Sequence, residues 1–336
     1  MTDSSASKVS VCIPVYNGSD YIADSIQSIL AQTYKNFNLI VCDNCSTDST
    51  EEIVRNFKDP RLTYVRNNQN LGLVGNHNRC LELADGEYVY FLHHDDIMLP
   101  DNLALKVSIL DEHPKVGLVH SDVLFMDKDG EPLDLTKFNV KRNYIEDGVK
   151  VFEKYILNMP VGASFFIGAV LARRDCYLKL GSFNPFLPCV NDSEMWMRIL
   201  LFYDVACIGK PLVIYRLHDG SISASKSDSY GLTLAGLEEH YLASNIVIEQ
   251  YKSRIPQWKN LKKRVDTSFS MKAVRRGVLG LKNGKFTESI TSFTTALKFY
   301  PPVFTKKVFW TFIWTLIIKQ VQKISKGIVA VDRYDK

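Results

Sequence analysis

The sequence predicts an α/β fold in which a mostly parallel sheet is flanked by helices. Short runs rich in β-branched residues alternate with stretches whose apolar residues recur at helical spacing. The glycine motifs of dinucleotide-binding and phosphate-binding loops, G-x-G-x-x-G and G-x-x-x-x-G-K-[ST], do not occur. The 336 residues, 46% of them hydrophobic and 11% aromatic, exclude a disordered chain and suffice for roughly two domain-sized units.

Four strands are expected within the first 126 residues, each followed by a helical pattern. Apolar residues at helical spacing from Ile22 to Leu30 follow the first strand. Ser49 opens the helix after the second strand, with Glu52 three residues further on, which is the arrangement of a capping box. The four expected strands are Val9–Val15, Leu39–Cys42, Leu62–Val65 and Tyr88–Leu92.

The second half of the chain is mixed and then helical. Between about residues 127 and 225, an apolar stretch at Phe165–Ala172 precedes a helix-like Asp192–Leu201 and a strand-like Leu212–Leu217. Beyond Tyr230 the pattern is helical. Residues 277–301 look like one helix-turn-helix unit in a single copy, which does not favour a repeat solenoid.

A polar cluster follows each of the four expected strands. The clusters are PVYNG at 14–18, DN at 43–44, RNN at 66–68 and HHDD at 93–96. Any one of them alone could be an exposed loop. Because ligands bind beyond the carboxyl ends of the strands in open parallel sheets, we expect all four clusters to converge on one crevice.

Several sequence blocks resemble family 2 glycosyltransferases with the GT-A fold. VSVCIPVYNGSDYIADSIQSILAQTY, VCDNCSTDST, NLGLVGNHN and DGEYVYFLHHDDIMLP resemble the nucleotide-sugar-binding half, in order and in spacing. NDSEMWMRI and YRLHDGSIS resemble the acceptor half, so that the resemblance covers residues 8 to 225. It implies a GT-A catalytic domain at 1–230, with a nucleotide-sugar half at 8–126 and an acceptor half at 127–225. A helical extension at 231–301 and a basic segment at 302–336 follow.

The resemblance also implies which residues hold the donor. Asp43 matches a position that contacts uracil or ribose, and a carboxylate accepts hydrogen bonds from an imide N–H or from sugar hydroxyls. Its alternative is a helix N-cap, a position that Asp48 or Ser49 fills better. Pro14, Tyr16 and Asn17 are expected to shape the pocket for the base and ribose. The other expected donor-binding residues are Asn70, Gly72, Asn78, Asp95, Arg216 and His218.

The HHDD cluster stands where the family usually carries Asp-x-Asp, the pair that holds a divalent metal against the donor diphosphate. Asp95 is the expected ligand, and His93 replaces the first Asp. His218 resembles a late histidine that approaches the metal or the diphosphate. Mn²⁺ or Mg²⁺ is expected as the cofactor, and an imidazole ligand favours Mn²⁺. Alternatively, His93 donates a hydrogen bond to phosphate, or His93 and His94 only fill space at the strand end.

Asp192 is the candidate catalytic base. By resemblance it falls at the family's catalytic Asp, and Asn191 stands where the family usually has Glu. A carboxylate is needed there to take the proton of the attacking sugar hydroxyl. Glu194 is the alternative, but it is expected to face elsewhere on the helix and to pair with Arg198 at i+4.

Charge is divided unevenly along the chain. Residues 252–336 hold 19 basic and 4 acidic residues, a net charge of +15, whereas residues 1–251 carry −11. Within the basic part, Val308–Ile318 is an apolar run of eleven residues, about 16 Å long as a helix and too short to span a bilayer. A polar stripe lies opposite it, at Lys307, Thr311, Thr315, Lys319, Gln322 and Lys326.

This stripe is typical of a helix that lies in an anionic membrane surface. A helix docked on the catalytic core and a homodimer contact are the alternatives. Nucleic acid is not expected as a partner, because no recognised binding motif accompanies the charge. The polar N-terminus MTDSSASK lacks a signal peptide. We therefore expect a cytoplasmic protein, peripheral on the inner face of the membrane, with free thiols at its seven cysteines.

Together these features predict an inverting glycosyltransferase. It would transfer a hexosyl or N-acetylhexosaminyl group from a nucleotide-sugar donor, expected to be UDP-linked, to a hydroxyl of a glycan acceptor. A lipid-linked acceptor, as in bacterial O-antigen or capsule assembly, would suit a membrane location. The alternative is a non-catalytic nucleotide-sugar-binding or scaffold protein of a glycan-assembly complex, which the replacement at His93 motivates.

Overall fold

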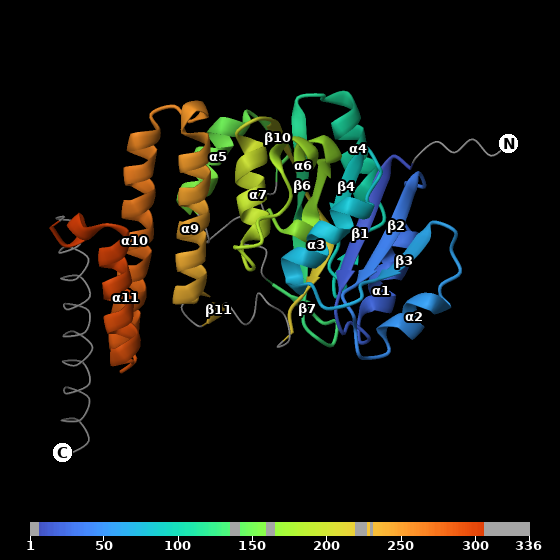
Figure 1. Cartoon of the computed structure of the whole chain (residues 1–336), viewed down its shortest axis with the longest axis horizontal. Helices are drawn as coiled ribbons and strands as arrows, with labels where there is room; N and C mark the ends of the chain where they lie inside the picture. Colours follow the sequence, from blue (N-terminus) through green and yellow to red (C-terminus); the bar gives the residue numbers. More distant parts are fainter. Residues whose placement is uncertain (1–6, 135–141, 159–164, 219–226, 229–230, 306–336) are drawn as a thin grey trace, which may run out of the picture.

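The computed structural model describes residues 7–134, 142–158, 165–218, 227–228 and 231–305 (Figure 1). Its main element is a ten-stranded sheet in the order β3-β2-β1-β4-β9-β6-β10-β5, with β7 paired to β6 and β8 to β10. The strands are β1 (Val9–Val15), β2 (Phe37–Asp43), β3 (Leu62–Arg66), β4 (Tyr88–Phe91), β5 (Ile97–Met98), β6 (Val116–Met126), β7 (Pro132–Leu133), β8 (Tyr144–Glu146), β9 (Val170–Arg173) and β10 (Asp204–Arg216). A separate short pair consists of β11 (Ser227–Asp228) and β12 (Gly231–Leu232).

Helices occupy most of the connections and the C-terminal part. They are α1 (Ile22–Leu30), α2 (Thr50–Asn56), α3 (Gly72–Leu83), α4 (Asn102–Glu112), α5 (Gly148–Asn158), α6 (Arg174–Leu180), α7 (Asn191–Leu200), α9 (Leu234–Tyr251), α10 (Trp258–Lys282) and α11 (Phe286–Phe299). Short 3-10 turns lie at η2 (Ile167–Ala169), η3 (Lys252–Arg254) and η4 (Pro301–Thr305).

Strand directions divide the sheet into two parallel groups. β3, β2, β1 and β4 run parallel in that order, and β6 runs parallel to β10. Between the groups lies β9, which is antiparallel to both β4 and β6. β5, β7 and β8 are also antiparallel to their neighbours. The α/β fold and the four expected N-terminal strands are confirmed, and the parallel arrangement holds within each group.

The sheet is covered on both faces. Successive residues of a strand point to opposite sides, so Val11 and Ile13 of β1 belong to a buried cluster with residues of α1, α2 and α4, whereas Cys12 belongs to the cluster that includes residues of α3, α5, α6 and α7. All three side chains are fully buried. The alternation of side chains along this central strand therefore contributes to two cores, one on each face.

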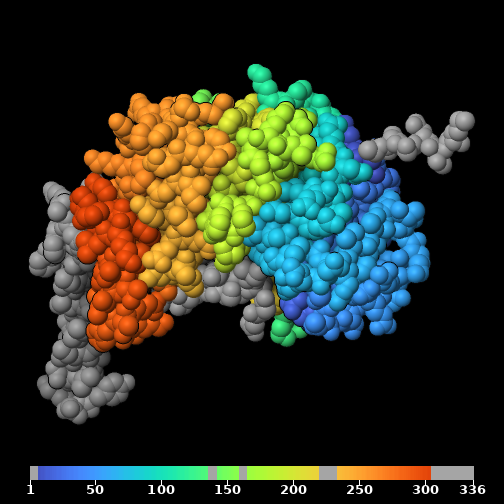
Figure 2. All heavy atoms as spheres, viewed as in Figure 1, coloured from blue at the N-terminus to red at the C-terminus, as the bar shows by residue number. Residues whose placement is uncertain are grey.

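The C-terminal helices extend one of these cores. α9 contacts α7, and α10 contacts both α5 and α11. Val247, Phe269 and Ala296 belong to the same buried cluster as the helices on that face of the sheet. Gly284, with a φ of +73°, makes the turn between α10 and α11. The predicted helix-turn-helix at 277–301 is confirmed, and Figures 1 and 2 show these helices side by side at one end of the molecule.

The predicted capping box at α2 is not formed. Ser49 is the N-cap residue, but its side chain makes no capping hydrogen bond. Asp48 Oδ1 accepts the Thr50 backbone N–H instead, at 3.1 Å. The carboxylate of Asp48, next to the N-cap residue, therefore accepts a backbone N–H of the first turn in place of the Ser49 side chain.

The predicted amphipathic run Val308–Ile318 and its polar stripe lie outside the described residues. Among the helices that the structure does describe, none is long and apolar enough to cross a membrane. The seven cysteines are free thiols, as expected.

Candidate active site

The loop after β4 lies where the sequence predicts the site, at the carboxyl ends of the parallel strands. Arg216, the last residue of β10, holds this loop. Its backbone N–H donates to Asp96 Oδ1 at 3.1 Å, and its Nε donates to the Asp95 carbonyl at 3.0 Å. The guanidinium also reaches Asp24 at 3.3 Å and lies over the Tyr21 ring. Arg216 is buried and already engaged, so a direct contact with the donor stays a prediction.

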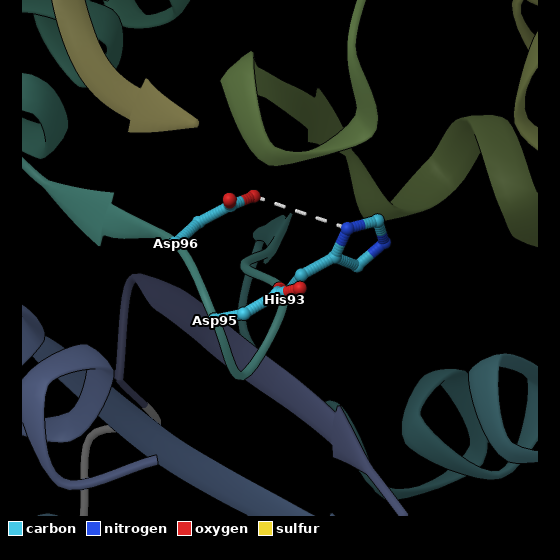
Figure 3. Close-up of side chains that lie close together, drawn as sticks. All are labelled: His93, Asp95 and Asp96. Atoms are coloured by element: carbon cyan, nitrogen blue, oxygen red, sulfur yellow. Dashed lines mark ion pairs between the residues drawn. The ribbon is translucent and has the colours of Figure 1, made fainter. Parts of the chain in front are cut away.

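Three metal-ligating side chains gather in this loop. One ligand atom from each of His93, Asp95 and Asp96 lies within 4.8 Å of the others (Figure 3). Figure 3 shows the His93 ring facing the Asp96 carboxylate, with 3.9 Å between Nδ1 and Oδ2. His218 Nε2 lies 2.9 Å from Asp95 Oδ2. The structure thus brings together the three predicted ligands His93, Asp95 and His218, and adds Asp96, which the resemblance had left unassigned.

The two carboxyls of the cluster differ in their electrostatic surroundings. Burial would raise the pKa of Asp95, but the charges of His94 and His93 and the hydrogen bond with His218 hold it below its usual value. Burial raises the pKa of Asp96 well above its usual value, and the neighbouring charge of Asp95 adds to the effect. Asp95 therefore loses its proton more readily than Asp96.

The ligand atoms of this cluster suit a divalent cation. Asp96 Oδ2 is buried and has no hydrogen-bond partner among the described residues. A Cβ added at Gly168 would lie 3.1 Å from that oxygen, so a side chain there would crowd it. Carboxylate oxygens suit Mg²⁺ and Mn²⁺, and the imidazole of His93 suits Mn²⁺ better.

His77 supports the cluster from the protein interior. Its ring centroid lies 6.1 Å from that of His93 and within 5.6 Å of those of Phe91 and Phe183. Its Nδ1 lies 2.9 Å from the Leu73 carbonyl. Burial, with a smaller effect from the charge of His93, lowers the pKa of His77 to about 3, which keeps the ring neutral near pH 7. Sequence reasoning missed His77, because only the packing of α3 on β4 brings it to the site.

Asp43 ends β2 and is fully buried. Its oxygens accept hydrogen bonds from the Ser46 backbone N–H at 2.9 Å, the Tyr64 hydroxyl at 2.6 Å and Arg66 at 2.8 Å. These bonds fix the loop after β2 against β3. A nucleotide contact at Asp43 stays a prediction, and it would have to share oxygens that already accept several donors.

The asparagines among the predicted donor-binding residues make hydrogen bonds that hold loops in place. Asn17, with a φ of +50°, accepts the Thr47 N–H at 2.8 Å, and Asn70 accepts the N–H of Gly72 at 2.8 Å. Asn78 bonds both backbone groups of Phe183, at 3.0 and 2.9 Å.

Pro14 and Tyr16, which are also predicted to bind the donor, lie at the end of β1. Pro14 is buried within the strand, whereas Tyr16 directly after it is 45% exposed. Of these two, Tyr16 therefore has a ring free to meet a base. The donor-binding roles of both residues, and those of the asparagines, stay predictions.

Asp192 stands in the first turn of α7. It is half-buried, and its Oδ1 accepts the Ser193 N–H at 2.6 Å. Burial raises the pKa of Asp192, while the Ser193 N–H and the charge of His93 oppose the shift. This charge interaction indicates that Asp192 is within electrostatic reach of His93.

Glu194 is engaged elsewhere, as the sequence predicts. Arg198 Nη2 lies 2.8 Å from Glu194 Oε2, and both side chains are buried. The same guanidinium donates to the carbonyls of Leu180, Gly181 and Ser182. The expected ion pair is confirmed, and Glu194 is therefore engaged by Arg198, while the role of Asp192 as the base stays a prediction.

Comparisons with known proteins agree with this fold. The profile of Glycosyl transferase family 2 matches residues 10–166. EpsE of Bacillus subtilis is 30% identical over 199 residues, which cover 58% of this chain and 67% of EpsE. The Escherichia coli UDP-Glc:alpha-D-GlcNAc-diphosphoundecaprenol beta-1,3-glucosyltransferase WfgD is 29% identical over 223 residues, 65% of this chain and 80% of WfgD.

A solved structure shares the whole fold. This structure is the mannosyltransferase PcManGT of Pyrobaculum calidifontis in complex with GDP-Man and Mn²⁺. The two chains superpose with a TM-score of 0.56 at 19% sequence identity, and the match covers 94% of this chain and 87% of PcManGT. The sheet, its flanking helices and the acidic loop after β4 define a glycosyltransferase of the GT-A fold. The sequence relatives make the assignment narrower: the chain belongs to glycosyl transferase family 2.

Proposed function

We propose that this chain is an inverting, metal-dependent glycosyltransferase that moves a hexosyl or N-acetylhexosaminyl group from a UDP-sugar to a lipid-linked glycan acceptor in surface-polysaccharide synthesis. The observation that carries the proposal is the cluster of His93, Asp95 and Asp96, with Asp192 in electrostatic reach of it. The reaction named for WfgD, from UDP-Glc to a GlcNAc diphospholipid, supports the choice of donor and acceptor.

The cluster is the place for the diphosphate of the donor. His93, Asp95 and Asp96 would hold Mn²⁺ or Mg²⁺, with His218 beside Asp95. When bound, the ion supplies positive charge that offsets the charge gathering on the leaving nucleoside diphosphate. Arg216 contributes by fixing the loop that presents these side chains.

Asp192 acts on the acceptor. Its carboxylate accepts the proton of the acceptor hydroxyl while that oxygen bonds to the anomeric carbon, and the bond from the anomeric carbon to the diphosphate oxygen breaks. Attack from the face opposite the leaving group inverts the anomeric configuration. Burial makes Asp192 more basic than an exposed aspartate, which suits a general base.

The proposed organisation assigns residues 1–230 to catalysis, 231–301 to a helical extension and 302–336 to the membrane surface. We place the protein in the cytoplasm on the inner face of the membrane, with a homodimer as the competing use of the basic end. The net charge of +15 over residues 252–336 supports this placement.

A thermal-shift screen tests the donor and the metal together. UDP-Glc, UDP-GlcNAc and GDP-Man are each added with Mn²⁺, with Mg²⁺ or with EDTA. A ligand at a hundredfold excess over its Kd stabilises a protein by about 2.7 kcal/mol, so we expect a clear rise in Tm with a UDP-sugar and Mn²⁺. Asp95→Asn should lose the part of the shift that depends on the metal.

Two outcomes would contradict the proposal. If no nucleotide sugar raises Tm under any condition, the donor assignment fails. If a donor binds but neither hydrolysis nor transfer follows with any acceptor, the chain is a binding or scaffold protein, which is the competing function.

A further inference from the structure

The loop between α6 and α7, residues 181–190, exposes an aromatic ring. Phe186 is 83% exposed, the largest exposed fraction among the large hydrophobic side chains that the structure describes. On either side of it, Phe183 and Leu187 are fully buried. The bare ring is therefore the tip of a loop whose flanks are inserted into the core.

The first half of the loop is held by side chains of α3 and α7. Arg198 donates to the carbonyls of Gly181 and Ser182. Asn78 of α3 bonds the backbone N–H and the carbonyl of Phe183 at 2.9 and 3.0 Å. The Phe183 ring packs 5.6 Å from that of His77, whose ring in turn lies 6.1 Å from that of His93. The loop therefore starts two ring contacts from the metal-ligating cluster.

The second half is fixed as firmly. The Phe186 backbone N–H donates to the Asn184 side chain at 3.0 Å, which tightens the turn at the tip. The Cys189 N–H donates to Glu239 of α9 at 2.7 Å. The chain then enters α7, where Asp192 is in electrostatic reach of His93. The exposed Phe186 thus lies three residues after Phe183, which is linked to His93 through the His77 ring, and six residues before Asp192.

Figure 2 places this segment on the molecular surface. The yellow-green atoms of α6, the loop and α7 form a visible face between the cyan atoms of α3 and the orange atoms of the C-terminal helices. The predicted donor-binding residues Tyr16, Asp43 and Asp95 lie at or just after the ends of β1, β2 and β4, and not in this loop. The loop leads instead to Asp192, the group that must touch the acceptor hydroxyl.

We propose that Phe186 is a stacking platform for the sugar ring of the acceptor; this inference rests on the function proposed above. A phenyl ring has no polar atom with which to hold a phosphate or a metal ion. Its electron-rich face attracts the C–H groups of a pyranose, as it attracts the edge of another aromatic ring. Because the loop is already ordered, little conformational entropy is lost when a sugar stacks on it.

Phe186→Ala in the full-length protein tests the proposal. The probe is α-GlcNAc diphosphate carrying a short alkyl chain, with a UDP-sugar and Mn²⁺. We expect the acceptor KM to rise about fivefold to tenfold, the range of an aromatic stacking contact, while kcat and the donor KM stay within twofold. Phe186→Trp should restore the acceptor KM. Leu178→Ala is the matched control, because Leu178 is a 62% exposed apolar side chain on α6.

Three outcomes would overturn the inference. One is an acceptor KM within twofold of the native value in Phe186→Ala. Another is an equal loss in Leu178→Ala. The third is an effect that vanishes when the probe is replaced by the methyl glycoside of GlcNAc, since Phe186 would then contact the alkyl chain and not the sugar.

Failure of the proposed function is seen separately. If the native protein transfers no sugar, saturation-transfer NMR with the same alkyl diphosphate probe still decides the question. Sugar-ring signals that are present with the native protein and lost in Phe186→Ala keep the inference, and equal signals overturn it.

Discussion

At the scale of single residues, the proposed role of Asp192 as the catalytic base gives the sharpest test. Asp192→Asn removes the proton acceptor and leaves an amide of nearly the same shape. We expect kcat to fall about 10²- to 10⁴-fold, while donor-dependent thermal stabilisation is kept because the metal-ligating side chains are unchanged. Transfer kinetics and a thermal-shift assay on the same preparation check both expectations. A variant with native kcat would rule out Asp192 as the base.

The pH dependence of transfer follows from the same residue. Burial raises the pKa of Asp192, and only the deprotonated carboxylate can accept a proton. The acid limb of kcat/KM should therefore lie at a higher pH than that of an ordinary exposed aspartate, and activity should fall as the pH drops through it. Asp192→Glu should move this limb. An unmoved limb would assign it to another group.

His77 affects stability rather than chemistry. Its pKa is lowered to about 3 in the folded protein and returns to about 6.5 in the unfolded chain. Below pH 6.5 the unfolded chain gains a proton that the folded protein does not, so stability falls, by on the order of 1 kcal/mol at pH 5.5. Urea unfolding at pH 7.5 and 5.5, with the metal removed, measures the difference.

His77→Asn provides the comparison, because its amide can still donate to the Leu73 carbonyl. The variant should lose stability less steeply between these two pH values. If the two slopes are equal, another group causes the acid sensitivity.

At the scale of elements, α7 depends on one buried ion pair. Arg198→Met would leave Glu194 buried without its partner, together with the carbonyls of Leu180, Gly181 and Ser182. Breaking such a pair from one side costs about 3–5 kcal/mol, and denaturant unfolding should show a loss of that size. Glu194→Met combined with Arg198→Met should recover part of it. A loss below about 1 kcal/mol would mean that water replaces the lost contacts.

The elements also show how far a sequence can be interpreted. The strands of the first parallel group were predictable, because each pairs with partners that share its apolar pattern and each is followed by a helix. The antiparallel insertion of β9 was not, because its neighbours β4 and β6 are distant in sequence and the apolar stretch Phe165–Ala172 contains no signal for direction.

The same limit applies to the site. Motif order predicted His93, Asp95, Asp192 and His218. The supporting contacts of His77, Tyr64 and Arg66 depend on packing that no local pattern contains. Asp96 was visible beside Asp95, but its buried, unpartnered oxygen appears only in the fold.

At the scale of the whole molecule, the charge asymmetry predicts membrane binding. The full chain should float with vesicles that contain anionic lipid at low salt and sink at high salt, because each Lys or Arg near such a surface contributes about 1 kcal/mol. A chain ending after Thr305 lacks 7 basic and 2 acidic residues and should stay in solution. Val303 is fully buried and must be kept in that chain.

Light scattering distinguishes the alternatives for the basic end. If neither chain floats and only the full chain is dimeric, the segment is a dimer contact. If neither floats and both are monomeric, it is not a membrane anchor. If both chains float equally, the membrane contact lies in residues before 306.

The position of β9 also has a consequence for the newly made chain. Until residues 170–173 leave the ribosome, β4 and β6 each present a bare hydrogen-bonding edge, and β6 has a second one until β10 is made. Unpaired edges invite pairing with another chain. A fragment that stops near residue 166, where the family profile ends, would keep those edges open and would contain neither Asp192 nor His218. Such a fragment should aggregate when expressed alone, so the end of the family profile is not a boundary at which this protein can be cut.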